Sequence, residues 1–393
     1  MRSHHADPPG SPPLDVDAIL ADPGIRIVVC CGSGGVGKTT TAAALGLRAA
    51  EHHGRRTVVL TIDPARRLAQ SLGLTALDDT PRQVKGVDAA GGELHAMMLD
   101  MKRTFDEVVL AHADPEKAEE IFANPFYAAM SSTFSGTQEY MAMEKLGQLR
   151  ARDEYDLIVV DTPPSRSALD FLDAPARLSR FLDGRMLRML LAPARAGGRS
   201  VFKLASASFG LFTRAVTRVL GTQLLTDLST FVAALDSVFG GFRERADRTY
   251  RILQDRETAF LVVAAPEPDA VREAAYFAGR LDAERMPLAG LVLNRMTTVS
   301  APAISAGSAR SAAHRLDELG GNGMAADAMR VHAAMVDQRA RQAAVAAGFA
   351  AAHPRVPVVE VPVQAADVHD LDGLRAIGRA LGGTGDDTPA ADN

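Results

Sequence analysis

Apolar residues run almost unbroken through seven short segments of the chain, and helix-forming stretches separate most of these segments. Continuous apolar runs of this length are typical of parallel strands whose two faces are both covered. Alternation of strands with helices predicts an α/β fold built on a doubly wound, mostly parallel sheet. The expected strands are residues 25–31, 57–62, 93–100, 155–161, 258–265, 288–294 and 356–362.

Two regions interrupt the alternation, because residues 101–152 and 175–255 carry helical patterns without strands. We interpret them as one helical subdomain inserted into a single α/β domain of residues 21–381. A third helical stretch, residues 300–352, is rich in alanine and is expected to cover the sheet. No internal repeat is evident, so the pattern indicates one such domain and not a tandem pair.

Both ends of the chain are expected to be disordered. Residues 1–20 are polar and rich in proline, and residues 382–393 are rich in glycine and acidic side chains. The amino-terminal residues lack the apolar stretch of a secretory signal. No run of about 18 uncharged apolar residues occurs, so no transmembrane helix is expected.

Charge and cysteine content narrow the class of protein. The net charge is −5 with a pI near 6.1, which disfavours nucleic acid as the main partner because phosphate backbones need a basic surface. The two cysteines, Cys30 and Cys31, are adjacent in an expected strand. Neighbouring strand residues point to opposite faces, so we expect these thiols neither to pair nor to share a metal. Such sparse cysteine favours the cytoplasm.

The segment GSGGVGKT, residues 32–39, follows the first expected strand and opens a helix that stops at Gly54. In this context its glycines form a backbone nest for phosphate, strengthened by the helix amino terminus. Lys38 is expected to reach the β- and γ-phosphates of ATP, and the Thr39 hydroxyl to ligate Mg²⁺. The residues expected to bind ATP here are Gly34, Gly35, Val36, Gly37, Lys38, Thr39 and Thr40.

Polar residues also end three other expected strands, which places Asp63, Asp161 and Asn294 at the same carboxyl edge of the sheet. Asp161 ends an apolar strand and is expected to hold Mg²⁺, directly or through water. Asp63 precedes Pro64, and two interpretations stay open for it. It is either a carboxylate that orients water near the γ-phosphate or an N-cap of the following helix.

Three segments, GSGGVGKTTTA, TIDPARRLAQSLG and VVDTPPSRSALDFLDAP, together resemble the ArsA-type ATPases. This family includes the arsenite-pump ATPase and the ATPase that delivers tail-anchored membrane proteins. The resemblance covers most of residues 25–380, and it is nearest to actinobacterial ArsA-like ATPases that occur as pairs of different subunits. It implies a P-loop ATPase that closes around ATP as a face-to-face dimer.

The resemblance also assigns roles. It implies that Asp63 activates the hydrolytic water as a catalytic residue beside Lys38, and that Asp161 is associated with Mg²⁺. It implies that Asn294 recognises the adenine base and that Pro362 lies where a loop packs against the base. The family's second switch segment, called switch II, normally reads DTAPTGH. The corresponding residues here, 161–167, read DTPPSRS, so Asp161 is kept.

A serine occupies position 33, where the family has a second lysine that reaches across the dimer to the partner's phosphates. A homodimer of this chain would lack both such charges, whereas a heterodimer with a lysine-bearing paralogue would complete this chain's site. Arg166 is an internal candidate for the missing charge, and a solvent-exposed arginine is the alternative interpretation of it.

The inserted helical regions carry apolar faces, and methionines cluster within them and in the strand just before them. Both features suit either an ordinary core or an adaptable groove for hydrophobic ligands. The resemblance adds weight to the groove, because tail-anchor ATPases bind their clients in this region. The apolar residues are Phe209, Phe212, Val216, Leu220, Leu224, Leu225, Leu228, Phe231, Val232, Leu235, Val238 and Phe239, and the methionines are Met97, Met98, Met101, Met141, Met143, Met186 and Met189.

The sequence therefore predicts a cytoplasmic, Mg²⁺-dependent ATPase that works as a dimer and couples its nucleotide state to a hydrophobic protein client. A nucleotide-binding regulatory subunit with little hydrolysis of its own is the alternative, favoured by Ser33. Arsenite transport fits poorly, since As(III) requires several cysteine ligands.

Overall fold

The computed structural model describes residues 11–62, 67–74, 76–88, 91–124, 127, 137–163, 244–320 and 323–382. The chain divides into two compact units, which are described separately. The sheet unit comprises Met1–Met98, Asp153–Leu169 and Ile252–Asn393, and the helical unit comprises Leu99–Arg152 and Asp170–Arg251. Within the described ranges, no helix combines the length and the apolar character needed to cross a bilayer.

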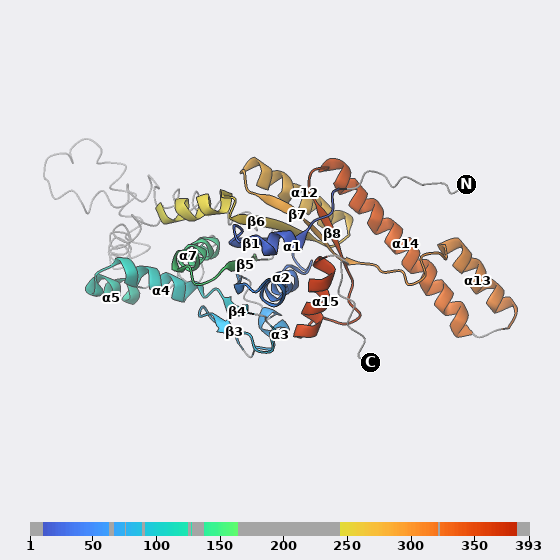
Figure 1. Cartoon of the computed structure of the whole chain (residues 1–393), viewed down its shortest axis with the longest axis horizontal. Helices are drawn as coiled ribbons and strands as arrows, with labels where there is room; N and C mark the ends of the chain where they lie inside the picture. Colours follow the sequence, from blue (N-terminus) through green and yellow to red (C-terminus); the bar gives the residue numbers. More distant parts are fainter. Residues whose placement is uncertain are drawn as a thin grey trace, which may run out of the picture. The chain divides into compact units, whose positions relative to one another are not determined.

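Eight strands form one sheet, in the order β3-β4-β2-β5-β1-β6-β7-β8 (Figure 1). All neighbouring strands are parallel except β3 and β4, which confirms the predicted α/β class. The seven expected segments all form strands, and β3 alone was not anticipated. The strands are β1 Ile27–Cys31, β2 Arg56–Thr61, β3 Arg82–Gln83, β4 Glu93–Met98, β5 Leu157–Asp161, β6 Thr258–Ala264, β7 Leu288–Met296 and β8 Val358–Pro362.

Helices cover both faces of this sheet. On one face, α2 packs on the central strands with α15 beside it, and α12 packs on β6 and β7 on the other (Figure 1). α2 ends at Gly54 with a left-handed backbone, as predicted. The helices of the sheet unit are α1 Val16–Ala21, α2 Lys38–His53, α3 Arg67–Ser71, α12 Pro268–Ala283, α13 Ala306–Glu318, α14 Gly323–Ala352 and α15 Leu371–Leu381.

The expectation that residues 1–20 form a disordered lead is wrong for residues 11–20. The backbone N–H of Leu14 donates to the Val358 carbonyl at 3.0 Å, which attaches this segment to the edge of the sheet. Asp15 then caps α1, whose Val16 and Leu20 are fully buried. The few apolar residues of this short helix pack on the core of the sheet unit. They are surrounded by prolines and aspartates in the sequence, so their helical spacing is not evident there.

Residues 300–352 cover the sheet less than expected. α13 and α14 form a hairpin (Figure 1). Ala306, Ala309 and Ala333 give it a small core of its own. α14 contacts α12, and it reaches the sheet where Gln342 Oε1 accepts a hydrogen bond from the Thr297 N–H at 2.8 Å. Alanine-rich helices therefore pack here mainly on each other.

The described part of the helical unit contains α4 Met101–His112, α5 Pro115–Ala123, α7 Thr137–Arg152 and residues 244–251. Met141 and Met143 of α7 are fully buried, as is Met97 in β4 of the sheet unit. For these three methionines the core interpretation is correct. Met186, Met189 and the apolar residues between Phe209 and Phe239 lie outside the described residues.

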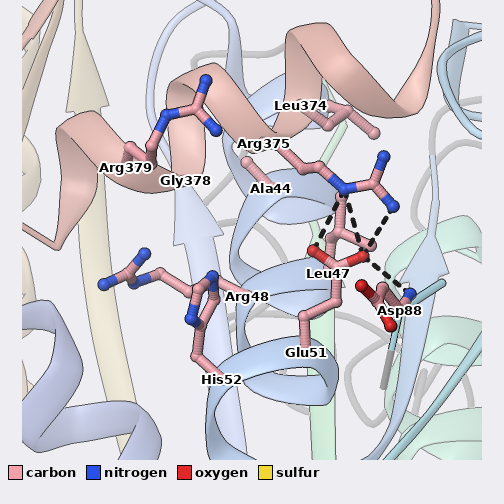
Figure 2. Close-up of a pocket in the computed structure, with 10 residues that line it drawn as sticks. All are labelled: Ala44, Leu47, Arg48, Glu51, His52, Asp88, Leu374, Arg375, Gly378 and Arg379. Carbon is pink, nitrogen blue, oxygen red and sulfur yellow. Dashed lines mark hydrogen bonds and ion pairs between the residues drawn. The ribbon is translucent and has the colours of Figure 1, made fainter. Parts of the chain in front are cut away.

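A clamp of charged groups joins α15 to α2. The Arg375 guanidinium donates to both oxygens of the Glu51 carboxylate at 2.8–3.2 Å (Figure 2). It also donates to the Gly86 carbonyl at 2.8 Å. Glu51 is almost wholly buried, and these hydrogen bonds raise the pKa of Arg375 above its ordinary value. The two helices border a groove of about 930 Å³, and Arg375 and Glu51 are among its lining residues. The clamp thus fixes the helix that carries the phosphate-binding loop.

Replacing Arg375 with alanine should lower the free energy of unfolding by about 1–3 kcal/mol, since a buried carboxylate would lose its charged donors. Arg379 lies on the same helix, is exposed and has no hydrogen bond or ion pair within the described residues. Arg379→Ala is therefore the matched control, expected to change stability by less than about 0.5 kcal/mol. Urea denaturation of both variants makes the comparison, and equal losses would contradict the clamp.

Candidate nucleotide-binding site

The turn between β1 and α2 is built against a neighbouring strand. Gly32 has φ 145°, and a Cβ there would lie 2.1 Å from the backbone carbonyl oxygen of Val263. Gly35 and Gly37 also have positive φ, and Gly37 caps α2 without any side-chain hydrogen bond. Gly34 and Gly35 are exposed, and Thr40 lies in the first helical turn. The backbone amides at this helix start are therefore free of side-chain caps, as an anion site requires.

Lys38 is folded back over the loop. Its side chain is buried, with 5% exposure, and its Nζ donates to the Ser33 carbonyl oxygen at 2.8 Å. The ammonium group thus lies beside the loop's own backbone. Ser33 itself is half-buried at the start of the loop.

Two threonine hydroxyls meet the Asp161 carboxylate at the end of β5. Thr39 Oγ1 donates to Asp161 Oδ2 at 2.7 Å, and Thr61 Oγ1 at the end of β2 donates to the same oxygen at 2.9 Å. Asp161 is fully buried. A hydroxyl and a carboxylate side by side are hard oxygen donors, which suit Mg²⁺ with phosphate oxygens and water as its other ligands. The predicted pair Thr39 and Asp161 is therefore brought together.

Cys30 lies opposite Asp161 in the pairing of β1 with β5, and Cys31 is the next residue of β1. Burial, followed by the charge of Asp161, raises the pKa of Cys30 well above its ordinary value. Burial raises the pKa of Cys31 to about 12. Both thiols are free and stay protonated at neutral pH, so neither provides a thiolate.

Asn294, near the end of β7, contacts the phosphate-binding loop directly. Its Nδ2 donates to the Val36 carbonyl at 2.8 Å, and its Oδ1 accepts from the Arg295 N–H at 3.0 Å. A Cβ on Gly37 would lie 2.2 Å from that Nδ2, so only glycine leaves room for this contact. The family resemblance implies that Asn294 recognises the adenine base, whereas its contact with the loop is seen only in the structure.

Pro362 ends β8 beside Met296, at the same edge of the sheet as Asn294. A cavity of about 510 Å³ opens there between the strand ends and α14, with Pro302 and Val336 among its apolar lining residues. Asp63 and Arg166 lie outside the described residues, so their positions relative to the loop stay predictions.

Comparison with known proteins agrees with this geometry. The model of the anion-transporting ATPase family matches residues 25–302, well over half of the chain. The chain belongs to this family. The matched region holds the phosphate-binding loop, Asp161 and Asn294, and it ends just before the α13–α14 hairpin.

Individual relatives are similar at low identity. ATPase GET3B of Arabidopsis thaliana is 26% identical over 289 residues, which is 67% of this chain and 62% of that protein. ATPase ASNA1 homolog 1 of Paramecium tetraurelia is 24% identical over 71% of this chain and 77% of its own length. A putative arsenical pump-driving ATPase of Prosthecochloris vibrioformis is 30% identical over 39% of this chain and 37% of its own. The chain thus spans less than two thirds of the first and third of these relatives.

The contact of Gly32 with Val263 leads to a prediction about the loop. Gly35→Ala should cost only the strain of a left-handed backbone, about 1–2 kcal/mol, because its Cβ would meet open space. Gly32→Ala adds a collision with a fixed carbonyl and should cost about 3 kcal/mol or more. Chemical denaturation of both variants measures the difference, and equal costs would show that the β1–β6 contact is not rigid.

Proposed function

We propose that this chain binds ATP with Mg²⁺ and hydrolyses it. The observation that carries the proposal is the 2.7 Å contact between Thr39 of the loop helix and Asp161 of β5, beside the uncapped amides of the loop. Thr39 and Asp161 would hold the metal, which when bound would neutralise charge on the phosphate oxygens. Lys38 would leave the Ser33 carbonyl for the β- and γ-phosphates.

Asp63 is proposed to orient the attacking water, following the resemblance of TIDPARRLAQSLG to the family's first switch. The water oxygen would bond to the γ-phosphorus as the bond from that phosphorus to the ADP oxygen breaks, and Asp63 would accept the proton that the water loses. The hydroxyl of Thr61, two residues earlier, already donates to Asp161. The strand that ends in this segment is therefore tied to the metal-binding carboxylate.

We further propose that the chain acts on a hydrophobic protein client and not on a metalloid. Some relatives are named putative arsenical pump-driving ATPases. However, the only two cysteines are buried in β1 with protonated thiols, whereas As(III) needs several thiolate ligands. Support for a protein client comes from the resemblance to tail-anchor ATPases, whose client region corresponds here to residues outside those described.

The chain is proposed to work as a dimer with a lysine-bearing paralogue, because Ser33 leaves its own loop without the second lysine. A homodimer is the alternative assembly. Ser33 also favours a second candidate function, a nucleotide-binding regulatory subunit that hydrolyses little ATP. Binding and turnover measured separately distinguish the two functions.

Lys38→Ala should abolish ATP binding in calorimetry, since the ammonium group is the loop's charged contact with the phosphates. Asp63→Asn is nearly isosteric and should retain ATP binding while turnover falls about 10²-fold or more. Retained binding by Lys38→Ala would refute the nucleotide site. Equal losses of binding and turnover in Asp63→Asn would instead assign this residue to the helix cap.

Single-turnover hydrolysis by the chain alone should be slow, because one missing preorganised donor costs about 10²–10³ in rate. Adding the lysine-bearing paralogue should restore turnover, and replacing the paralogue's lysine should remove the gain. Ser33→Lys should raise turnover without the paralogue. Fast turnover by the unmodified chain, with no further gain from the paralogue, would contradict the proposal that the paralogue's lysine supplies the missing charge. If Arg166→Ala then lost that turnover, Arg166 would be the residue that supplies the charge instead.

A further inference from the structure

Arg295 occupies an unusual backbone position at the end of β7. Its φ is 66°, and Asp153 and Arg285 are the other non-glycine residues with positive φ in the described part of the chain. The pairing of β7 with β8 shifts register between Asn294 and Met296, so Arg295 is the bulged residue. Asn294 Oδ1 accepts its N–H and fixes the bulge.

The side chain gives no structural reason for this conformation. Arg295 is exposed, and its guanidinium makes no hydrogen bond or ion pair with any described residue. A left-handed backbone costs a non-glycine residue on the order of 1–2 kcal/mol. Strain of this kind, at a bulge beside a binding edge, is characteristic of residues that are aimed at a ligand.

The bulge lies next to the phosphate-binding loop. Asn294, the residue before Arg295, donates to the Val36 carbonyl inside the loop. The strand order β5-β1-β6-β7 places β7 on one side of the loop and Asp161 of β5 on the other. Arg295 is therefore on the side away from the metal-binding pair, Thr39 and Asp161.

We propose that Arg295 is a nucleotide-binding residue whose guanidinium contacts the α-phosphate of a nucleoside diphosphate or triphosphate. The inference rests on the proposed function and adds a residue to that site. A guanidinium offers several donors to phosphate oxygens, and the transferred phosphate would lie on the opposite side of the loop. Arg295 therefore sets affinity for ATP and ADP alike, and it takes no part in the hydrolytic step.

Arg285 supplies a matched control. It is also an exposed arginine with a left-handed backbone, φ 57°, and no side-chain partner within the described residues. It precedes β7, whereas Arg295 lies at the carboxyl end of the same strand. Glycine at either position removes one positive charge and relieves the same kind of strain.

The experiment measures calorimetric affinities of the full chain for ADP and for ATP with Mg²⁺. Arg295→Gly should weaken both by about tenfold or more, and to the same extent, because a charged hydrogen bond common to both nucleotides is lost. Arg285→Gly should leave both affinities unchanged. Arg295→Lys should retain part of the affinity, and the midpoint of thermal unfolding without nucleotide should not fall in Arg295→Gly.

Three results would overturn the assignment. Unchanged affinities in Arg295→Gly would show that the side chain does not contact nucleotide. Loss of ATP affinity alone would place it at the γ-phosphate, and equal losses in Arg285→Gly would indicate a general charge effect. If the unmodified chain bound neither ADP nor ATP, the proposed function itself would fail. If the unmodified chain bound both nucleotides and Arg295→Gly bound them with the same affinities, only the assignment of Arg295 would be refuted.

Discussion

A fully buried carboxylate, Asp161, is the constraint around which the nucleotide edge is arranged. An ionised carboxylate in a protein interior is costly unless donors or cations compensate it. Here the hydroxyls of Thr39 and Thr61 donate to one oxygen, from α2 and β2 respectively. The contact therefore brings the loop helix and two strand ends to one point. The same charge helps to keep the thiol of Cys30 protonated.

The loop helix α2 and the loop before it are held by contacts from β7, α15 and α1. Asn294 attaches β7 to the loop through Val36, and the clamp between Arg375 and Glu51 attaches α15 to the helix's later turns. The Arg48 guanidinium of α2 donates to both carboxylate oxygens of Asp17 in α1, which attaches the amino-terminal segment to the loop helix. Binding groups on such braced elements keep their geometry better than groups on loose loops. The amino-terminal helix, which the sequence predicts to be disordered, is thus part of this bracing.

The sequence predicted the sheet well because central parallel strands are apolar on both faces, and that signal survives without coordinates. It missed β3 because two residues carry no periodicity. Lys38, Thr39 and Asp161 were found through spacing and strand context, since their chemistry depends on a local turn and one neighbouring strand end. Asn294's contact with Val36 joins positions 258 residues apart in the chain. No local pattern encodes such a contact, and the same holds for the bulge at Arg295.

The two sides of the loop differ in where a positive charge would come from and in which part of the nucleotide it would contact. Ser33, Gly34 and Gly35 lie at least partly open to solvent, and Lys38 is folded toward the Ser33 carbonyl. A cation supplied by another subunit needs such an accessible approach, and it would act on the phosphate being transferred. Arg295 belongs to β7, across the loop from Asp161. In the proposed contact, its positive charge would act on the part of the nucleotide that does not change during hydrolysis. Because only interactions that strengthen in the transition state raise the rate, a charge at Arg295 in that position would not replace the missing lysine. Under the proposed function, the serine at position 33 would limit turnover and would leave nucleotide affinity to residues of this chain.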